Sequence, residues 1–194
     1  TLKLKEKNPF FLSRSQAYIG VLIDDLINKT HDEPYRMFTS RAEFRLLLRH
    51  DNADLRLMEY GYEFDLIDNK TYDKYLARKR EIKLITNEEL KKKISKSIFN
   101  NHFKGTSSEL KQSTAVADLI KRPELSLNQL LQLITDKKCL SSTISEVEFN
   151  SKYSGYIDRQ LAQIKKFKSI ENKRIPKSLD YHSIKALSVE AREK

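Results

Sequence analysis

Turn-forming residues are scarce in this chain, which has four glycines and four prolines among 194 residues. β-Sandwiches and dinucleotide-binding α/β folds need more glycines, because tight hairpins and phosphate loops use backbone conformations that other residues avoid. The glycines lie far apart, so neither G-x-G-x-x-G nor G-x-x-x-x-G-K-[ST] is present. The sequence therefore predicts an all-α fold without a flavin or nucleotide cofactor site of its own.

Groups suited to catalysis or metal binding are also few. The single cysteine excludes an intrachain disulfide and a multi-cysteine metal site. The four histidines show no H-x-x-x-H spacing. We therefore predict neither catalytic residues nor a metal site, and interpret Cys139 as a small core residue. Without an apolar run of transmembrane length or a signal peptide, the chain is expected to be cytoplasmic, with no membrane partner.

Positive charge is abundant. Lys and Arg number 37 against 27 Asp and Glu, which gives a formal net charge of +10. Such a chain is attracted to polyanions, usually nucleic acid or acidic lipid. The alternative is that the lysines only keep a helical protein in solution, and composition leaves both interpretations open.

Apolar periodicity and capping residues predict the helices. Capping boxes at Ser13/Gln16 and Ser40/Glu43 open helices that run to about residue 27 and about residue 49. Helical spacing then predicts long helices over about 69–97, with a break near residues 86–87, and over about 144–171. Two short helices are expected at about 115–121 and 127–133. The first helix is apolar nearly all round, so we expect it to be buried against something large.

The organisation expected from these patterns is two small helical lobes. Residues 1–12 are interpreted as a basic linker, residues 13–100 as the first lobe and residues 101–194 as the second. The boundary lies in the segment 100–108, which contains Gly105 and three hydroxyl residues. Residues 188–193 resemble the first turn of a helix, which suggests that the sequence ends inside a larger protein.

The predicted helix over residues 40–49 places three arginines on one stripe. Arg41, Arg45 and Arg49 are spaced i, i+4 and i+8, and Arg36 and Arg56 flank them. Like charges stacked in this way repel one another unless an anion offsets them. The stripe therefore indicates contacts with RNA phosphates, or with carboxylates of this or another domain.

Two further features combine charge with possible function. The last 44 residues hold 11 Lys and Arg against 5 Asp and Glu, and they mix aromatic with basic side chains in a way that suits RNA. The candidates there are Tyr153, Tyr156, Arg159, Lys165 and Lys166. A solvated helix face is the alternative. The adjacent acids Asp24 and Asp25 either face a cofactor or basic side chains, or belong to a solvated strip.

Several segments together resemble a known family. Residues 33–49, which read EPYRMFTSRAEFRLLLR, and residues 51–57, which read DNADLRL, resemble signatures of the MnmG/GidA family. Residues 14–26 (RSQAYIGVLIDDL), Arg122-Pro123-Glu124 and residues 152–160 (KYSGYIDRQ) are similar to further family segments. Phe44 stands where a tyrosine is common.

This resemblance implies a function. The family uses FAD, NADH and a methylene-tetrahydrofolate, and with a partner GTPase, MnmE, it adds a carboxymethylaminomethyl or aminomethyl group to carbon 5 of the wobble uridine of tRNA. Its members are homodimers whose flavin domain precedes the region similar to this chain, and their helical C-terminal region contributes to tRNA and partner binding. The chain is thus expected to bind tRNA, to hold an incomplete MnmE site and to be inactive alone.

Two other functions remain open from the residues themselves. A stand-alone helical module for protein–protein interaction would use its arginines to pair with a partner's carboxylates. A helix-turn-helix DNA binder would use the short helices around Pro123, but Lys121 and Arg122 are the only cations between residues 115 and 133.

Overall fold

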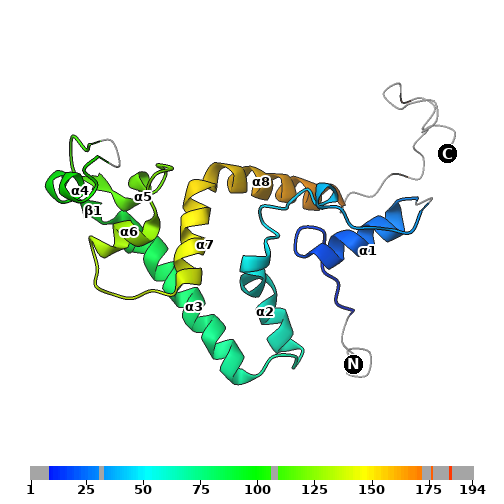
Figure 1. The fold of residues 1–194 in the computed structure, drawn as a ribbon. Coiled ribbons are helices and arrows are strands. Elements are labelled where there is room, and N and C mark those ends of the chain that lie inside the picture. The colour runs from blue at the N-terminus through cyan, green and yellow to red at the C-terminus, as the bar shows by residue number, and fades with distance from the viewer. Residues whose placement is uncertain (1–8, 31–32, 106–108, 172–175, 177–183, 185–194) are drawn as a thin grey trace. The chain divides into compact units, whose positions relative to one another are not determined.

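The computed structural model describes residues 9–30, 33–105, 109–171, 176 and 184 (Figure 1). The chain divides into two compact units, residues 1–160 and residues 161–194. The boundary between the two units falls between Gln160 and Leu161, whereas the sequence analysis expected a lobe boundary at residue 100. The expected helical turn at residues 188–193 and the linker residues 1–8 lie outside the described part of the chain.

The described residues are mainly helical, which confirms the all-α prediction. The α-helices are α1 (Tyr18–Asn28), α2 (Ala53–Glu63), α3 (Asn69–Asn87), α4 (Lys96–His102), α5 (Val116–Leu119), α6 (Leu127–Gln132), α7 (Ser141–Lys152) and α8 (Ser154–Glu171). Short 3-10 turns cover Thr39–Arg41, His50–Asn52 and Glu89–Lys91. Strands β1 (Lys93–Ile94) and β2 (Thr114–Ala115) pair antiparallel, with Lys93 opposite Ala115.

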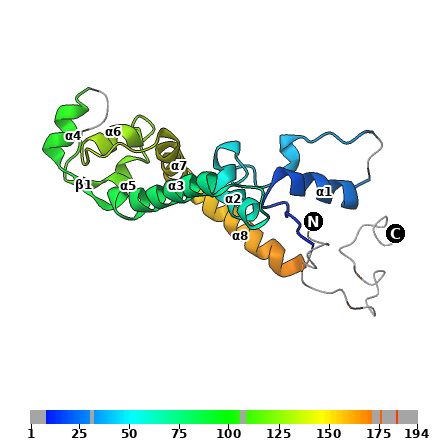
Figure 2. The same ribbon diagram turned by 90° about the horizontal axis from the view of Figure 1, so that it is seen from below.

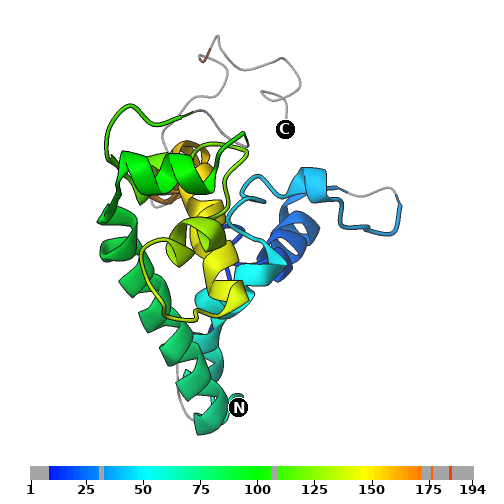
Figure 3. The same ribbon diagram turned by 60° about the vertical axis from the view of Figure 1, so that its left-hand side comes forward.

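The apolar core of the first unit lies around the C-terminal end of α3. Figure 2 shows α4, α5 and α6 gathered there, and Figure 3 shows α7 beside α3. The buried side chains of this cluster are contributed from both sides of residue 100: Ile85, Leu90, Ile94, Phe99, Phe103, Leu110, Val116, Leu119, Ile120, Leu125, Leu127, Leu130, Leu131 and Val147. A single core therefore unites α3 to α7.

Two helices of this core begin at side-chain caps that the sequence analysis did not identify, although it placed their starts correctly. The Asp68 side chain accepts a hydrogen bond from the Thr71 amide at 2.6 Å and starts α3, which ends at Asn87, the expected break. Ser126 and Gln129 form a complete capping box on α6. The long helix expected over about 144–171 is interrupted at Tyr153, so that α7 and α8 are separate elements.

The start of the first helix differs from its prediction. Ser13 and Gln16 do interact, because the Ser13 amide donates to the Gln16 Oε1 at 2.9 Å, but they close a turn and α1 begins only at Tyr18. This turn lies directly against Gly20, where an added Cβ would lie 2.3 Å from the Ser13 carbonyl oxygen. A glycine at this position thus permits the turn and the helix to touch.

The prediction of a helix over residues 40–49 is wrong. This segment contains one 3-10 turn, Thr39–Arg41, followed by irregular turns in which the Leu47 and Leu48 amides both donate to the Phe44 carbonyl. Phe44 and Leu48 are buried, as is Ala42. Tertiary contacts of these side chains and of the arginines override the local helical pattern, so the stripe of three arginines does not form.

A pair of glycine substitutions tests the contact at Gly20. Gly20→Ala should lower the free energy of unfolding by about 1–3 kcal/mol, because the new methyl group would force the residue 12–13 backbone to move. Gly155→Ala should raise it by about 0.5–1 kcal/mol, because Gly155 lies in α8 with no atom within 4 Å of an added Cβ. Urea denaturation of both variants measures the difference, and equal effects of the two substitutions would contradict the close contact.

Candidate functional site

A buried carboxylate organises the residues around α1. The Asp25 side chain is fully buried and accepts hydrogen bonds from Arg14 Nη1 at 2.6 Å, from Lys29 Nζ at 2.7 Å and from Tyr35 Oη at 2.9 Å. The Arg41 Nη1 lies 3.6 Å from the Asp25 Oδ2, which is the oxygen that accepts from Tyr35. Of the two interpretations of this acidic pair, the structure favours the one in which a carboxylate faces basic side chains.

Arg14 connects this carboxylate to the arginine-rich segment. Its guanidinium pairs with Asp24 at 2.8 Å and with Glu43 at 2.6 Å, and it donates to the Arg41 carbonyl oxygen at 3.0 Å. The turn before α1, α1 itself and the segment around residue 41 are therefore held by one side chain. Planar guanidinium groups suit this role because they offer five donors in fixed directions.

The protonation equilibria follow from these contacts. Burial by itself would raise the pKa of Asp25, but hydrogen bonds from Lys29, Arg14 and Tyr35 outweigh burial and hold that pKa well below its ordinary value. Burial, followed by the hydrogen bond to Asp25, raises the pKa of the Tyr35 hydroxyl. Asp25 is therefore a fixed negative charge at neutral pH, and the Tyr35 hydroxyl remains protonated.

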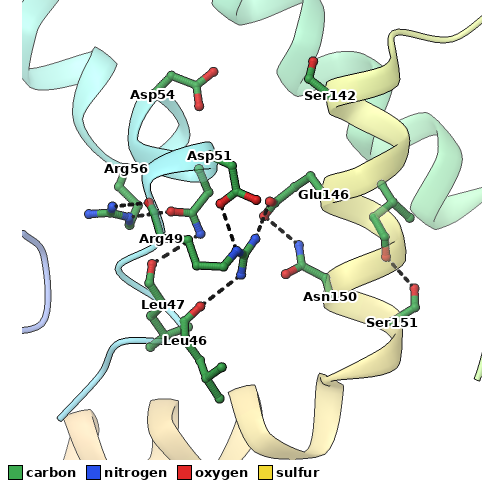
Figure 4. A network of polar contacts seen from close by, with 12 residues as sticks. Leu46, Leu47, Arg49, Asp51, Asp54, Arg56, Ser142, Glu146, Asn150 and Ser151 are labelled. Atoms are coloured by element: carbon green, nitrogen blue, oxygen red, sulfur yellow. Dashed lines mark hydrogen bonds and ion pairs between the residues drawn. The ribbon is translucent and has the colours of Figure 1, made fainter. Parts of the chain in front are cut away.

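Arg49 forms a second buried network, which Figure 4 shows. Its Nη2 lies 2.5 Å from the Glu146 Oε2 on α7, its Nε lies 2.9 Å from Asp51, and its Nη1 donates to the Leu46 carbonyl at 3.0 Å. The guanidinium carbon lies 3.5 Å from the centre of the Phe149 ring. Glu146 is itself buried, so this pair joins the arginine-rich segment to α7 across 97 residues of sequence.

Arg56 is used in a similar way. From α2 it donates to the carbonyl oxygen of Arg49 at 2.9 Å (Figure 4). It also donates to the Asn52 side chain at 2.9 Å and to the carbonyl oxygen of Gln16. Burial, followed by the nearby charge of Arg49, lowers its pKa. Arg41, Arg49 and Arg56, all proposed from sequence as RNA contacts, thus have partners within the chain.

Arg45 of the predicted stripe and Arg36, which flanks it, face solvent. Arg45 is exposed, and within the described part of the chain it makes no hydrogen bond or ion pair. Arg36 is also exposed, and its guanidinium lies 5.7 Å from the centre of the Phe38 ring. Arg36 and Arg41 line an open cavity of about 520 Å³ together with Thr30, Glu33, Pro34, Tyr35 and Phe38. The structure therefore places Arg41, Arg49 and Arg56 in contacts within the chain and leaves Arg36 and Arg45 exposed.

The aromatic and basic residues after α7 lie on the surface. Tyr153 is 43% exposed and Tyr156 is 56% exposed. The Tyr153 ring stacks on Phe149 with centroids 4.5 Å apart, and the Arg159 guanidinium lies 4.6 Å from the centre of the Tyr156 ring. In the second unit, Lys165 and Lys166 are exposed on α8. Exposed rings beside cations can stack with unpaired bases.

Sequence reasoning missed two residues of these networks. Glu146 is one of two acids in α7, and no local pattern connects it with Arg49. Arg78 belongs to a basic run that resembles solvated surface, but it pairs with Asp54 on α2 and lies 3.3 Å from the Ser142 carbonyl oxygen of α7. Its burial could have been inferred only from the packing of α3 against α7.

Other chemistry is sparse in the described residues. They contain no group of three His, Cys, Asp or Glu side chains that could hold a metal ion. None of their helices has the length and apolar composition needed to cross a bilayer. Cys139 packs half-buried against the core, where burial, followed by the Glu81 carboxylate, raises the pKa of its thiol. A raised pKa lowers the thiolate fraction and hence the reactivity of the sulfur.

Stability should depend on pH through Asp25. Because its folded pKa is depressed, its stabilising contribution is present above the unfolded pKa of about 3.9 and is lost as pH falls toward the folded value. Asp25→Asn should therefore cost about 3 kcal/mol at pH 7, and this cost should shrink below pH 4. Urea denaturation of both proteins at pH 7, 5, 4 and 3 measures it. A difference independent of pH would contradict the assignment.

Arg49 and Arg45 form a matched pair of substitutions. Arg49→Ala should lower the free energy of unfolding by about 3–5 kcal/mol, because it leaves the buried Glu146 carboxylate without its cation. Arg45→Ala should change it by less than about 0.5 kcal/mol, because Arg45 is exposed. Adding Glu146→Gln to Arg49→Ala should recover part of the loss. Equal stability of the two alanine variants would refute the network in Figure 4.

Comparisons with known proteins connect this geometry with a family. The family described as "tRNA modifying enzyme MnmG/GidA C-terminal helical domain" matches residues 69–161. The MnmG proteins of Clostridium kluyveri and Listeria innocua, both called tRNA uridine 5-carboxymethylaminomethyl modification enzymes, are 52% and 45% identical to this chain over 100% and 99% of its length. The chain spans 31% of each of these relatives.

A solved structure agrees in fold as well as in sequence. A crystal structure of Aquifex aeolicus GidA matches 99% of this chain and 30% of its own, with a TM-score of 0.73 and 34% identity. A second crystal form of the same protein gives a TM-score of 0.70. Taken with the relatives above, these likenesses show that the chain belongs to the MnmG/GidA family and corresponds to its C-terminal helical region.

Proposed function

We propose that this chain is the tRNA-binding and scaffold-forming C-terminal part of a cytoplasmic, homodimeric enzyme. With FAD, NADH and the partner GTPase MnmE, that enzyme would add carboxymethylaminomethyl or aminomethyl groups to carbon 5 of the wobble uridine of tRNA. The observation that carries this proposal is the 52% identity, over the whole chain, to a protein named for that modification. In this arrangement the chemistry belongs to the remainder of the enzyme.

The charge of the chain supports a role in binding RNA. The formal net charge is +10, and polyanions attract such a surface at long range. A helical region that holds many cations and no glycine-rich phosphate loop is better suited to phosphate contacts on a nucleic acid than to binding a flavin. This argument concerns the whole surface and does not by itself select residues.

Exposure selects among the candidate contacts. Arg49 pairs with the buried Glu146 carboxylate, and Arg56 donates to the Asn52 side chain and to two backbone carbonyl oxygens. Each guanidinium would lose these partners before it could reach a phosphate, so both are poor contacts. Arg36 and Arg45 are exposed and can reach an RNA without breaking an ion pair within the described residues. We therefore place phosphate contacts at Arg36 and Arg45.

The aromatic residues after α7 extend this surface. Tyr156 is 56% exposed, and the Arg159 guanidinium lies 4.6 Å from the centre of its ring. Tyr153 is braced by Phe149, whose ring also contacts Arg49. We propose that this group stacks on unpaired bases. Lys165 and Lys166, in the second unit, are separate candidates for phosphate contacts.

Substitutions in a full-length protein that carries this chain test the RNA surface. Tyr156→Ala should weaken tRNA binding by about 1–3 kcal/mol, whereas Tyr156→Phe, which retains the ring, should not. Arg45→Gln and Arg36→Gln should each flatten the dependence of log K on log salt by roughly 0.7–0.9 per lost phosphate contact. Mobility shifts against tRNA and against duplex DNA, over a salt series, give these values.

Arg49→Ala serves as the control for this experiment. It should lower thermal stability while leaving the salt slope for tRNA unchanged, because its charge is already neutralised inside the fold. A full-length protein whose tRNA affinity and salt slope are the same in all of these variants would show that the surface lies elsewhere. No affinity for tRNA at all would favour the protein–protein interaction module.

A further inference from the structure

The first helix exposes an apolar face that nothing in the described structure covers. Ile19, Ile23, Leu26 and Ile27 are 48%, 46%, 51% and 74% exposed. With about 100° between successive residues they fall on one side of α1. The opposite side carries Val21 and Asp25, which are fully buried. The sequence predicts a helix buried nearly all round, yet the structure buries only half of it.

The composition of this helix limits what can cover the face. The eleven residues of α1, YIGVLIDDLIN, contain two acids and no lysine or arginine. RNA is a poor occupant because the face offers no cation to a phosphate. Helices that lie in a membrane surface carry basic residues on their polar side, and α1 does not. The occupant should therefore be an apolar protein surface.

A second copy of this chain is a weaker candidate for covering this face than a segment of the same polypeptide. A second copy must first meet this one by diffusion. A segment of the same polypeptide needs no such encounter, since a short linker holds it at an effective concentration near the millimolar range. The chain spans 31% of its relatives, so in these proteins about twice its own length lies outside the matched region.

The position of α1 indicates which segment that is. The family description places the matched region at the C-terminal side of the family protein, so most of the remaining residues precede it. Phe10 is fixed against α2 by ring contacts to Tyr60 at 4.9 Å and to Phe64 at 4.7 Å. A preceding domain would therefore enter the fold only eight residues before α1 begins.

We propose that the exposed face of α1, formed by Ile19, Ile23, Leu26 and Ile27, is the docking surface for the part of the polypeptide that precedes this region in the full-length family protein. Arg14, Lys29 and Tyr35 bind Asp25 on the buried side of α1. These contacts fix the orientation of the helix, so that its apolar side faces outward. The proposal depends on the family assignment and not on RNA binding.

Cysteine labelling in the full-length protein tests this docking. Ile23→Cys and Ile27→Cys place a thiol on the face, and Ala77→Cys places one on the exposed surface of α3 as the matched control. The two α1 positions should react with a maleimide roughly tenfold or more slowly than the control, because labelling then requires local opening. Peptide mass spectrometry reads each site separately, and the rates in denaturant correct for intrinsic reactivity.

Dilution and added tRNA separate the possible occupants. Protection that is independent of protein concentration and of tRNA supports intramolecular docking. Protection lost on dilution would identify a second copy and overturn the proposal, as would protection that appears only with tRNA. Equal labelling of α1 and control positions would also overturn it. Since tRNA affinity is measured independently, failure here leaves the proposed RNA function standing, and the reverse also holds.

Discussion

The contact between Arg49 and Glu146 fixes the geometry of the arginine-rich segment. Two charged groups removed from water are stabilised only when further polar partners surround them. Asp51, the Leu46 carbonyl and the Phe149 ring supply these partners. Because Glu146 belongs to α7, which packs on the apolar core through Val147, the segment is tied to that core by charge and not by an apolar helix face.

The same physical device is repeated around α1. Arg14 pairs with three carboxylates, and the buried Asp25 accepts hydrogen bonds from three side chains. The N-terminal part of the chain is therefore held largely by ion pairs, whereas α3 to α7 share an apolar core. This division has a functional consequence, because the arginines used for structure are not available to a polyanion. The ion pairs of Asp25 also leave the apolar side of α1 exposed, where we propose that another protein surface docks.

Local patterns predicted the elements whose stability is decided locally. The helices expected from about residue 69 and over about 127–133 correspond to α3 and α6, and the break after Asn87 follows from residues that favour helix ends. Residues 40–49 failed this reasoning although their spacing suits a helix. Glu146, the buried partner of Arg49, lies 97 residues away, and no local pattern contains that information.

The sequence by itself determined the helical class, the ends of α3 and α6, the basic charge and the resemblance to a family, because composition, capping and signatures are properties of nearby residues. Only the tertiary structure decided which arginines are free. A guanidinium binds a phosphate or a carboxylate by the same hydrogen-bond geometry, so the choice depends on which group the fold brings within reach. For Arg49 that group is Glu146. Arg45 is exposed, and the described residues bring no such group within its reach.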